Sequence, residues 1–379
     1  MGVADRSEAR EEAPGAVAER AQSHAAAGGL AAVALTIQRA AGNRTATAWA
    51  QHLQRKPKTK PKPKDPIDTA IAKKEWAKAA DALSELPAAV IETRLKKLKA
   101  KQRESLMQGA REIERTAWTE PVIQAMEKVD PKSANIGSLR WARASGFTAR
   151  AGQWFHALGT EDAHKIAHEL AFSKAQLTGI IADGKGLETV FKDVWAYVPK
   201  SERMLYVMTL LVDTHGYPVN GAAGIVGNLG GESSLIPSRV EGSAEWSPTR
   251  TGGTDWTDEQ IRDRDKKAKK GPKLPGVGLA QWTTKERREG FFARPEGTAL
   301  LYDMDGQVNY LVDELGSKFA KLNKKLLDPK VTVQNAADLV LEKFEAPADP
   351  EASRSARRAN ADKAAKLYND ANPPAPATP

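Results

Sequence analysis

The chain has 379 residues, of which 41% are hydrophobic and 28% charged, so it is long enough for two or three soluble domains with substantial cores. It contains no cysteine, which excludes thiol catalysis, cysteine-based zinc sites and disulfides, and no stretch approaches the ~18 apolar residues of a membrane span. The formal net charge of +9 suits an anionic partner such as nucleic acid, anionic lipid or a bacterial wall, and it is equally compatible with simple solubility.

The first 66 residues are expected to be a partly disordered delivery or docking segment followed by a linker. Residues 1–55 are rich in Ala, Glu and Arg, and their beginning lacks the apolar core of an ordinary secretory signal. Residues 56–66 read KPKTKPKPKDP, in which the prolines favour an extended chain and the lysines repel one another. No aromatic residue is interleaved with these lysines, so we do not expect a nucleic-acid site.

Residues 67–200 predict a string of helices that would act as a spacer or docking domain. The helical period is clear over 76–110 and breaks at Leu86-Pro87. His164 and His168 are spaced to share one helix face, as metal ligands can be, but HKIAH lacks the internal glutamate of zinc hydrolases and no third ligand is evident. We therefore expect surface or packing histidines and no metal site.

Residues 203–370 predict a second helical region, followed by a tail at 371–379 that is expected to be disordered. Its most informative stretch is GNLGGESSLIPS, residues 227–238. Glu232 continues, in the last turn of a helix, the apolar stripe formed by Ala222, Ile225, Val226 and Leu229. Partial burial and the negative end of the helix dipole both disfavour a charged carboxylate there, which is the environment that a general acid requires. The alternative is a helix that ends at Gly230 and Gly231 and leaves Glu232 exposed.

The same helix carries an unusual number of glycines. Each of the five glycines between residues 221 and 231 would cost about 1 kcal/mol relative to alanine in a helix interior. Close approach of another helix, or of substrate, would compensate this cost.

Three ordered segments resemble the phage-tail type of lysozyme. They are GIVGNLGGESSLIPS (224–238), GVGLAQWTTKERR (276–288), and the run from QVNYLVDEL (307–315) to KFEAPADPEASRSARRANADKAAKLY (343–368). The resemblance covers about 203–370 and implies a mainly α, lysozyme-like domain with a small β-hairpin. Such a domain would cleave the MurNAc–GlcNAc backbone of peptidoglycan without a metal or organic cofactor.

The resemblance also implies roles for individual residues. Glu232 would donate the proton to the glycosidic oxygen, and a second carboxylate would stabilise the oxocarbenium ion or activate water. Glu241 is the expected second acid, and Glu245, Asp255 and Asp258 are alternatives in the polar stretch 239–275. The residues expected to bind substrate are Gln281, Trp282, Thr283, Ser233 and Asn228.

Two of the neighbouring residues have structural alternatives. Trp282 would serve equally well in core packing. Glu345 is expected to have a structural role, either capping or pairing with Arg354 or Arg357.

A shorter resemblance concerns the N-terminal segment. LTIQRAAGNRTATAWAQHLQRKP, residues 35–57, is similar to a segment near the start of cargo proteins of extracellular contractile injection systems. It implies a protein made in the bacterial cytoplasm and carried to the cell wall by a phage-tail-like particle, whose tube or baseplate would be a partner. The alternative for this segment is a simple surface helix.

Two other functions remain open at this level. A lytic transglycosylase would use Glu232 alone, because a hydroxyl of the sugar itself attacks. A non-catalytic glycan-binding or structural protein of the particle would keep the fold without turnover.

Overall fold

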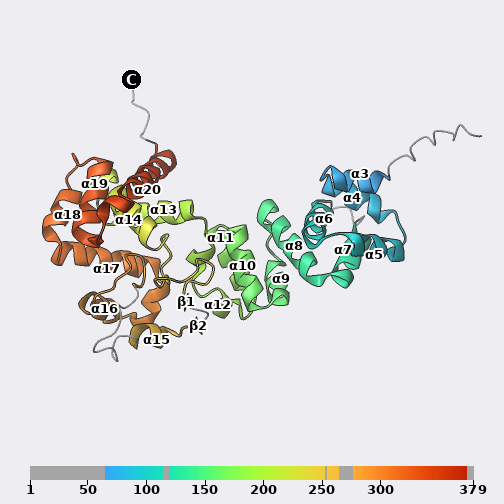
Figure 1. The fold of residues 1–379 in the computed structure, drawn as a ribbon, viewed down its shortest axis with the longest axis horizontal. Helices are drawn as coiled ribbons and strands as arrows, with labels where there is room; N and C mark the ends of the chain where they lie inside the picture. The colour runs from blue at the N-terminus through green and yellow to red at the C-terminus, as the bar shows by residue number, and fades with distance from the viewer. Residues whose placement is uncertain (1–64, 114–118, 252–253, 264–275, 374–379) are drawn as a thin grey trace, which may run out of the picture. The chain divides into compact units, whose positions relative to one another are not determined.

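The computed structural model describes residues 65–113, 119–251, 254–263 and 276–373, and from Pro66 onward they belong to one unit. The predicted delivery segment and nearly all of the predicted linker lie outside the described residues. The described part is mainly helical, so the mainly α fold is confirmed (Figure 1). None of its helices combines the length and the apolar character needed to cross a membrane.

The first group of helices packs around its own apolar core. Ile91, Leu106 and Met126 are among its fully buried side chains. The predicted break at Leu86-Pro87 is present, since one helix ends at Ser84 and the next begins at Ala88. The helices are α3 (Pro66–Ala72), α4 (Trp76–Ser84), α5 (Ala88–Lys97), α6 (Ala100–Glu112), α7 (Glu120–Val129) and α8 (Pro131–Ser145).

A second group of shorter helices follows and builds a second core. Phe155, Phe172 and Phe191 are fully buried in it, and Phe155 contacts the other two edge to face. Ile236, from the turn after Glu232, is buried in the same core, which ties this group to the C-terminal helices. The elements are α9 (Ala151–Leu158), α10 (Thr160–Leu170), α11 (Lys174–Asp183), α12 (Leu187–Val190) and the 3₁₀ helix η2 (Val194–Tyr197).

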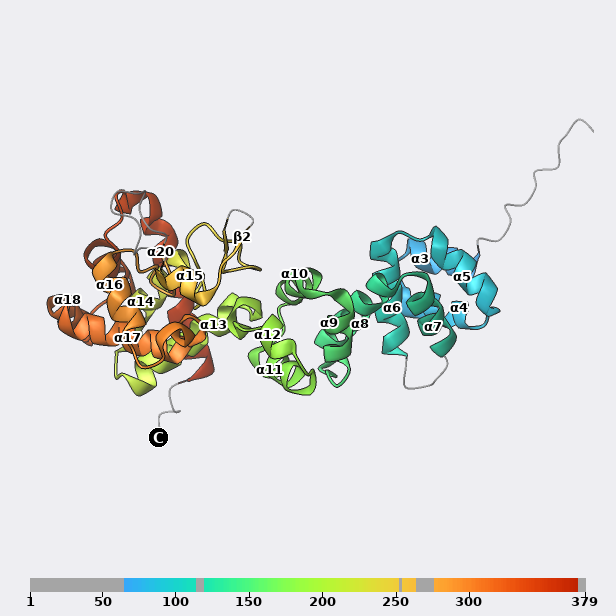
Figure 2. The same ribbon diagram turned by 90° about the horizontal axis from the view of Figure 1, so that it is seen from below.

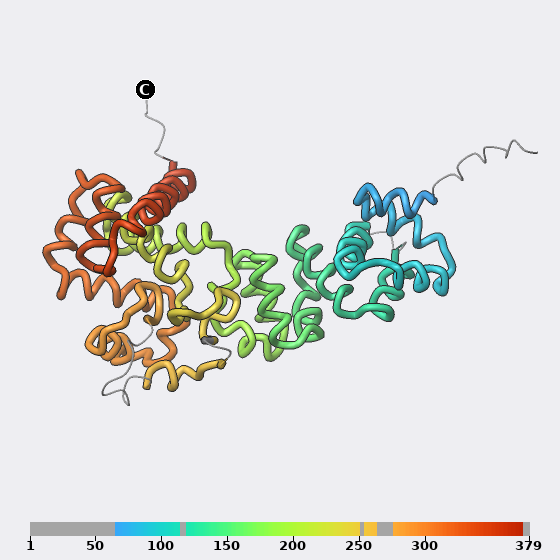
Figure 3. Tube along the Cα trace, in the orientation of Figure 1, coloured from blue at the N-terminus to red at the C-terminus, as the bar shows by residue number. Residues whose placement is uncertain are grey.

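The C-terminal region forms the third and largest core (Figures 2 and 3). Its helices are α13 (Lys200–Thr209), η3 (Leu210–Thr214), α14 (Val219–Glu232), α15 (Asp258–Asp263), α16 (Lys285–Phe292), η4 (Gly297–Tyr302), α17 (Met304–Ser317), α18 (Ala320–Leu326), α19 (Val333–Val340), η5 (Leu341–Glu345) and α20 (Pro350–Ala371). The expected small hairpin is present: β1 (Arg250–Thr251) pairs antiparallel with β2 (Thr254–Asp255).

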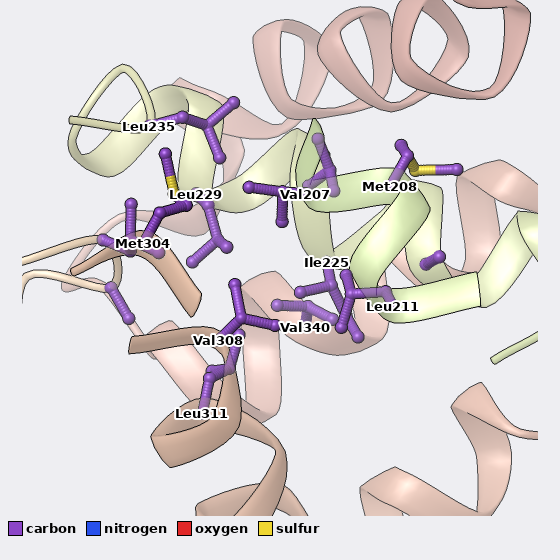
Figure 4. Close-up of a cluster of buried hydrophobic side chains, with 14 of the residues drawn as sticks. Val207, Met208, Leu211, Ile225, Leu229, Leu235, Met304, Val308, Leu311 and Val340 are labelled. Atoms are coloured by element: carbon purple, nitrogen blue, oxygen red, sulfur yellow. The ribbon is translucent and has the colours of Figure 1, made fainter. Parts of the chain in front are cut away.

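Helix α14 lies at the centre of this core. Ile225 and Leu229, two positions of the apolar stripe, pack among Val207, Val308 and Val340 from three other helices (Figure 4). Both faces of α14 are covered, because the helix packs most extensively against α19 and α20. The periodicity of the sequence therefore identified one buried face, and the neighbouring helices cover most of the rest.

The glycines of α14 are explained by close helix packing, as expected. A Cβ atom on Gly224 would lie 2.5 Å from the carbonyl carbon of Ala336 in α19, and one on Gly227 would lie 2.7 Å from the carbonyl oxygen of Arg357 in α20. Real Cβ atoms do not approach so closely, so only glycine allows these two helices to contact the α14 backbone. This approach brings α20 alongside the end of α14 that carries Glu232.

Candidate active site

Glu232 is the last residue of α14, and its side chain is 22% exposed. Arg357 of α20 forms an ion pair with its Oε1, and another nitrogen of the same guanidinium group donates to the carbonyl oxygen of Asn228. Burial and the helix dipole, the two effects predictable from the sequence, both oppose a negative charge on Glu232. The structure adds a nearly buried cation that stabilises the carboxylate and also satisfies a carbonyl group of the last turn.

A second cation lies at the same helix end. The ammonium group of Lys200, the first residue of α13, donates to the carbonyl oxygen of Gly230 at 2.6 Å. Burial lowers the pKa of Lys200, with a further contribution from the positive charge of Arg203. Lys200 and Arg357 together place positive charge at the negative end of the α14 dipole.

The turn that follows Glu232 has an unusual backbone. Ser234 and Leu235 have φ values of 55° and 59°, in the left-handed region that non-glycine residues rarely occupy. The Oγ of Ser233 accepts a hydrogen bond from the Leu235 amide at 3.1 Å, which stabilises the turn locally. Such conformations cost about 1–3 kcal/mol each and concentrate at functional sites.

Glu345 is a second carboxyl group that acts on Glu232. It is the last residue of the π-helix η5, and Ala346 after it has a φ of 42°. Its Oε1 is buried and has no hydrogen-bond partner among the described residues. Burial, and after it the negative charge of Glu232, raises the pKa of Glu345 to about 8. Glu345 therefore holds a proton near neutral pH while Glu232 is paired with Arg357.

Glu345 has a different environment from the one expected. Arg357 binds Glu232, and Arg354 forms its ion pairs with Asp338, Glu342 and Glu351. The predicted pairing of Glu345 with Arg354 or Arg357 is thus not formed. A carboxyl group with a buried, unpartnered oxygen is costly unless it is protonated.

A buried ion pair borders this region. Arg287 of α16 donates two hydrogen bonds of 2.8 Å to Glu314 of α17, and Glu314 also accepts the indole N–H of Trp282 at 3.0 Å. The guanidinium group of Arg287 lies over the ring of Phe344, at 4.4 Å from its centroid. The positive charge of Arg287 counteracts part of the burial effect on the neighbouring Glu345.

The two nearest candidates for a second catalytic carboxylate make different contacts. Glu241 is exposed and accepts the backbone N–H of Gly276 at 2.9 Å. Glu245 accepts the hydroxyl of Ser234, two residues after Glu232, at 2.7 Å. That hydrogen bond is the main cause of the lowered pKa of Glu245, to which the positive charge of Arg203 also contributes. Glu245 is therefore an ionised carboxylate bound to the turn that carries Glu232.

The alternatives Asp255 and Asp258 lie farther along the chain in and after the hairpin. Asp255 is exposed and 3.7 Å from Arg250, its cross-strand partner. Asp258 accepts the hydroxyl of Tyr302 and forms an ion pair with Lys192. Both oxygens of Asp258 are thus engaged in contacts that fasten α15 to its neighbours.

The five predicted substrate-binding residues differ in how deeply their side chains are buried. Trp282 is fully buried and packs against Phe291 and Tyr310, which favours its core-packing role. Asn228 is also fully buried, and its amide group donates to the carbonyl oxygens of Gly224 and Ala337. These two side chains are enclosed by protein.

The other three predicted residues lie in turns. Ser233 is buried at the end of α14, where its hydroxyl donates to Leu229. Gln281 is partly exposed with a φ of 44°, and its amide group donates to the carbonyl oxygens of Gly278 and Arg239. Thr283 is exposed. Of the five predicted residues, only Gln281 and Thr283 therefore present accessible surface.

The residues that complete the site come from segments distant in sequence. Glu232 and Arg357 are 125 positions apart, and Glu345 and Arg287 come from two further elements. The basic run KERR and the Phe-Glu of KFEAP belong to the three segments of the resemblance, but nothing local indicates which arginine meets which glutamate. Within the described part of the chain, no group of three or more histidines and acids is arranged to hold a metal ion.

One of the comparisons with known proteins gives a match. Residues 202–368 match the family model described as phage tail lysozyme, which confirms the resemblance for the C-terminal domain. The match indicates a lysozyme-like activity on peptidoglycan. No curated protein and no solved structure matches the chain.

Proposed function

We propose that the C-terminal domain, a match to the phage tail lysozymes over residues 202–368, is a muramidase that cleaves the MurNAc–GlcNAc backbone with Glu232 as general acid. One observation carries the proposal: Glu232, on a partly exposed helix end, is paired with Arg357 and coupled to a buried carboxyl group, Glu345. A site with two interacting carboxyl groups keeps a proton available near neutral pH, because ionising both at once is unfavourable.

In this mechanism Glu345 is the source of the proton, because burial and the negative charge of Glu232 raise its pKa to about 8. Arg357 holds the carboxylate of Glu232 in place. Glu232 is the more exposed of the two, so it takes the proton from Glu345 and gives it to the glycosidic oxygen as the bond breaks. The attacking water then returns a proton to Glu345.

For the second catalytic carboxylate, the contacts favour Glu245 over Glu241. Glu245 is ionised and bound to Ser234, so it is positioned on the turn that Glu232 begins. An ionised carboxylate can stabilise the oxocarbenium ion or activate water. We propose Gln281 and Thr283 as the substrate contacts, because both keep accessible surface.

Wall lysis by the Glu232→Gln variant tests the proposal. Glutamine keeps the shape of the side chain but cannot donate the proton, so the rate should fall by about 10²- to 10⁴-fold. Glu289→Gln, which changes an exposed acid of α16, is the matched control and should lyse walls at the normal rate. Unchanged lysis by Glu232→Gln would rule out the proposed acid.

The released products separate the alternative chemistries. Hydrolysis gives muropeptides with a free reducing end, whereas a lytic transglycosylase releases 1,6-anhydro sugars that differ by one water in mass. If the unmodified protein lyses none of several wall types, the non-catalytic glycan-binding alternative is favoured.

We also propose delivery of the protein by a phage-tail-like injection particle. The support is the segment LTIQRAAGNR, residues 35–44, which resembles the start of cargo proteins of such particles. Replacing Gln38 and Arg39 by alanine should abolish co-purification with the particle while wall lysis by the free protein is retained. Continued co-purification would contradict this role.

A further inference from the structure

A polar cavity of about 440 Å³ lies between the second group of helices and the hairpin region of the C-terminal domain. One wall carries His164, Lys192 and Tyr197, and the other carries Trp246, Asp255 and Tyr302. The first wall precedes residue 202, where the family match begins. The cavity is therefore an addition that this chain makes to the lysozyme domain, and its volume is typical of small-ligand sites.

The two walls are held together by buried and charged contacts. Asp193 is buried and accepts the backbone N–H of Ser238 at 3.0 Å and its hydroxyl at 2.5 Å. Lys192 forms an ion pair with Asp258, and Ile236 packs into the core of the second group of helices. The cavity is thus formed in advance, so a ligand would not need to bring its walls together.

The lining combines aromatic rings with hydrogen-bonding side chains of positive and negative charge. The rings of Trp246 and Tyr302 are partly exposed, so they offer apolar surface with a polar edge. The lining has two basic side chains, Lys192 and Arg250, and three acidic ones, Glu161, Asp193 and Asp255. Because positive charge is not in excess, the lining favours a neutral, hydroxyl-rich ligand over a strongly anionic polymer, and aromatic surface beside polar groups is what a sugar ring needs.

The cavity is connected to the proposed catalytic residues through Glu245. Glu245 accepts the hydroxyl of Ser234 after Glu232, its other oxygen lies 3.6 Å from His168 of α10, and Trp246 follows it directly. The ammonium group of Lys165, also from α10, lies 5.1 Å from the ring centroid of Trp246. The α10 helix therefore contacts the segment that runs from the catalytic turn to the cavity.

We propose that this cavity binds a neutral N-acetylated sugar of the glycan strand that Glu232 cleaves. The inference rests on the proposed function, and it assigns a role to the helices before residue 202: they provide half of an accessory glycan site. The site would hold the strand beyond the region where the bond is broken.

Binding is measured in the full-length Glu232→Gln protein, so that the ligand is not degraded. The probe is the soluble trimer of N-acetylglucosamine, titrated by calorimetry, and a synthetic stem peptide is titrated in parallel. Adding Trp246→Ala should weaken trimer binding by about 3- to 10-fold, which corresponds to the loss of one aromatic contact. Adding His164→Ala, on the wall outside the family match, should weaken it as well.

Phe147→Ala is the matched control, since Phe147 is an exposed aromatic residue of the helical region that does not line this cavity. It should leave the affinity unchanged, and circular dichroism checks that each variant is folded. The proposal is overturned if the trimer does not bind, if it binds equally well to Trp246→Ala and His164→Ala, or if only stem-peptide binding falls. Because turnover plays no part in this titration, its failure is distinguishable from normal lysis by Glu232→Gln, which would instead contradict the proposed acid.

Discussion

Arg357 joins the end of α14 to α20, because its guanidinium group donates both to the carbonyl oxygen of Asn228 and to the carboxylate of Glu232. The arginine side chain is 9% exposed and that of the glutamate 22%. The pair thus links a helix end, the proposed general acid and the closing helix of the domain. Its geometry explains why α20 must approach α14 as closely as the glycines allow.

Loss of this arginine should affect both stability and activity. In Arg357→Met the carboxylate of Glu232 and the carbonyl of Asn228 lose their common donor, and breaking a largely buried pair costs about 3–5 kcal/mol. Thermal or urea unfolding measures this change. Arg357→Lys retains the positive charge but not the several N–H donors of the guanidinium group. Its loss of stability should therefore be smaller than that of Arg357→Met. Equal stability of the unmodified protein and Arg357→Met would show that the pair contributes nothing.

The pH dependence of stability should identify Glu345. Its pKa is raised by burial to about 8 in the folded protein, whereas its ordinary value is 4.5. Between these two values the folded protein holds a proton that the unfolded chain has released, so the free energy of unfolding falls as pH rises from about 5 to about 8. Glu345→Gln cannot ionise and should lack this part of the decline. Glu342→Gln, an exposed acid of the same π-helix, should keep it.

Glu345→Gln should also alter the pH profile of wall lysis. In the unmodified protein the activity should decrease as the pH rises past about 8, when Glu345 loses its proton. In Glu345→Gln this group cannot ionise, so the decline near pH 8 should be absent. Rates measured from pH 5 to 10 test this, and coincident profiles would exclude a role for Glu345.

Two glycine substitutions in α14 should have opposite effects. In Gly224→Ala the new methyl group meets the backbone of α19, so the helices must separate at a cost of about 1–3 kcal/mol. In Gly230→Ala the nearest atoms are side-chain atoms at 3.5 Å, which is ordinary contact. That variant should be more stable by about 0.5–1 kcal/mol, because alanine favours the helix. Urea unfolding of both variants measures the difference, and equal shifts would contradict the packing argument.

The identity of the second carboxylate can be tested with one pair of variants. Glu245→Gln removes the negative charge beside the catalytic turn, so lysis should fall by at least about 100-fold if Glu245 stabilises the transition state. Glu241→Gln weakens only its hydrogen bond to the Gly276 amide and should retain most of the activity. A larger loss in Glu241→Gln than in Glu245→Gln would restore Glu241 as the second acid.

Several features of the molecule were predictable from short-range patterns. The helical period located α14 and placed Glu232 on its apolar stripe, since residues three and four apart share a helix face whatever surrounds them. The glycines predicted close contact, because their cost in a helix must be offset. The order of three segments indicated the lysozyme-like domain before any contact was known.

The pairing of charges depended on the tertiary structure. Burial and the helix dipole are local effects, and both oppose a negative charge on Glu232. Arg357, 125 residues away, adds a hydrogen-bonded positive charge to this carboxylate, and Glu345 lies near enough for the charge of Glu232 to raise its pKa. The sequence by itself determined where the helices and the proposed acid lie, whereas the folded chain decided which charged groups surround that acid. The reason is physical: helix formation depends on neighbours along the chain, but the energy of a buried charge depends on whatever groups the fold brings beside it.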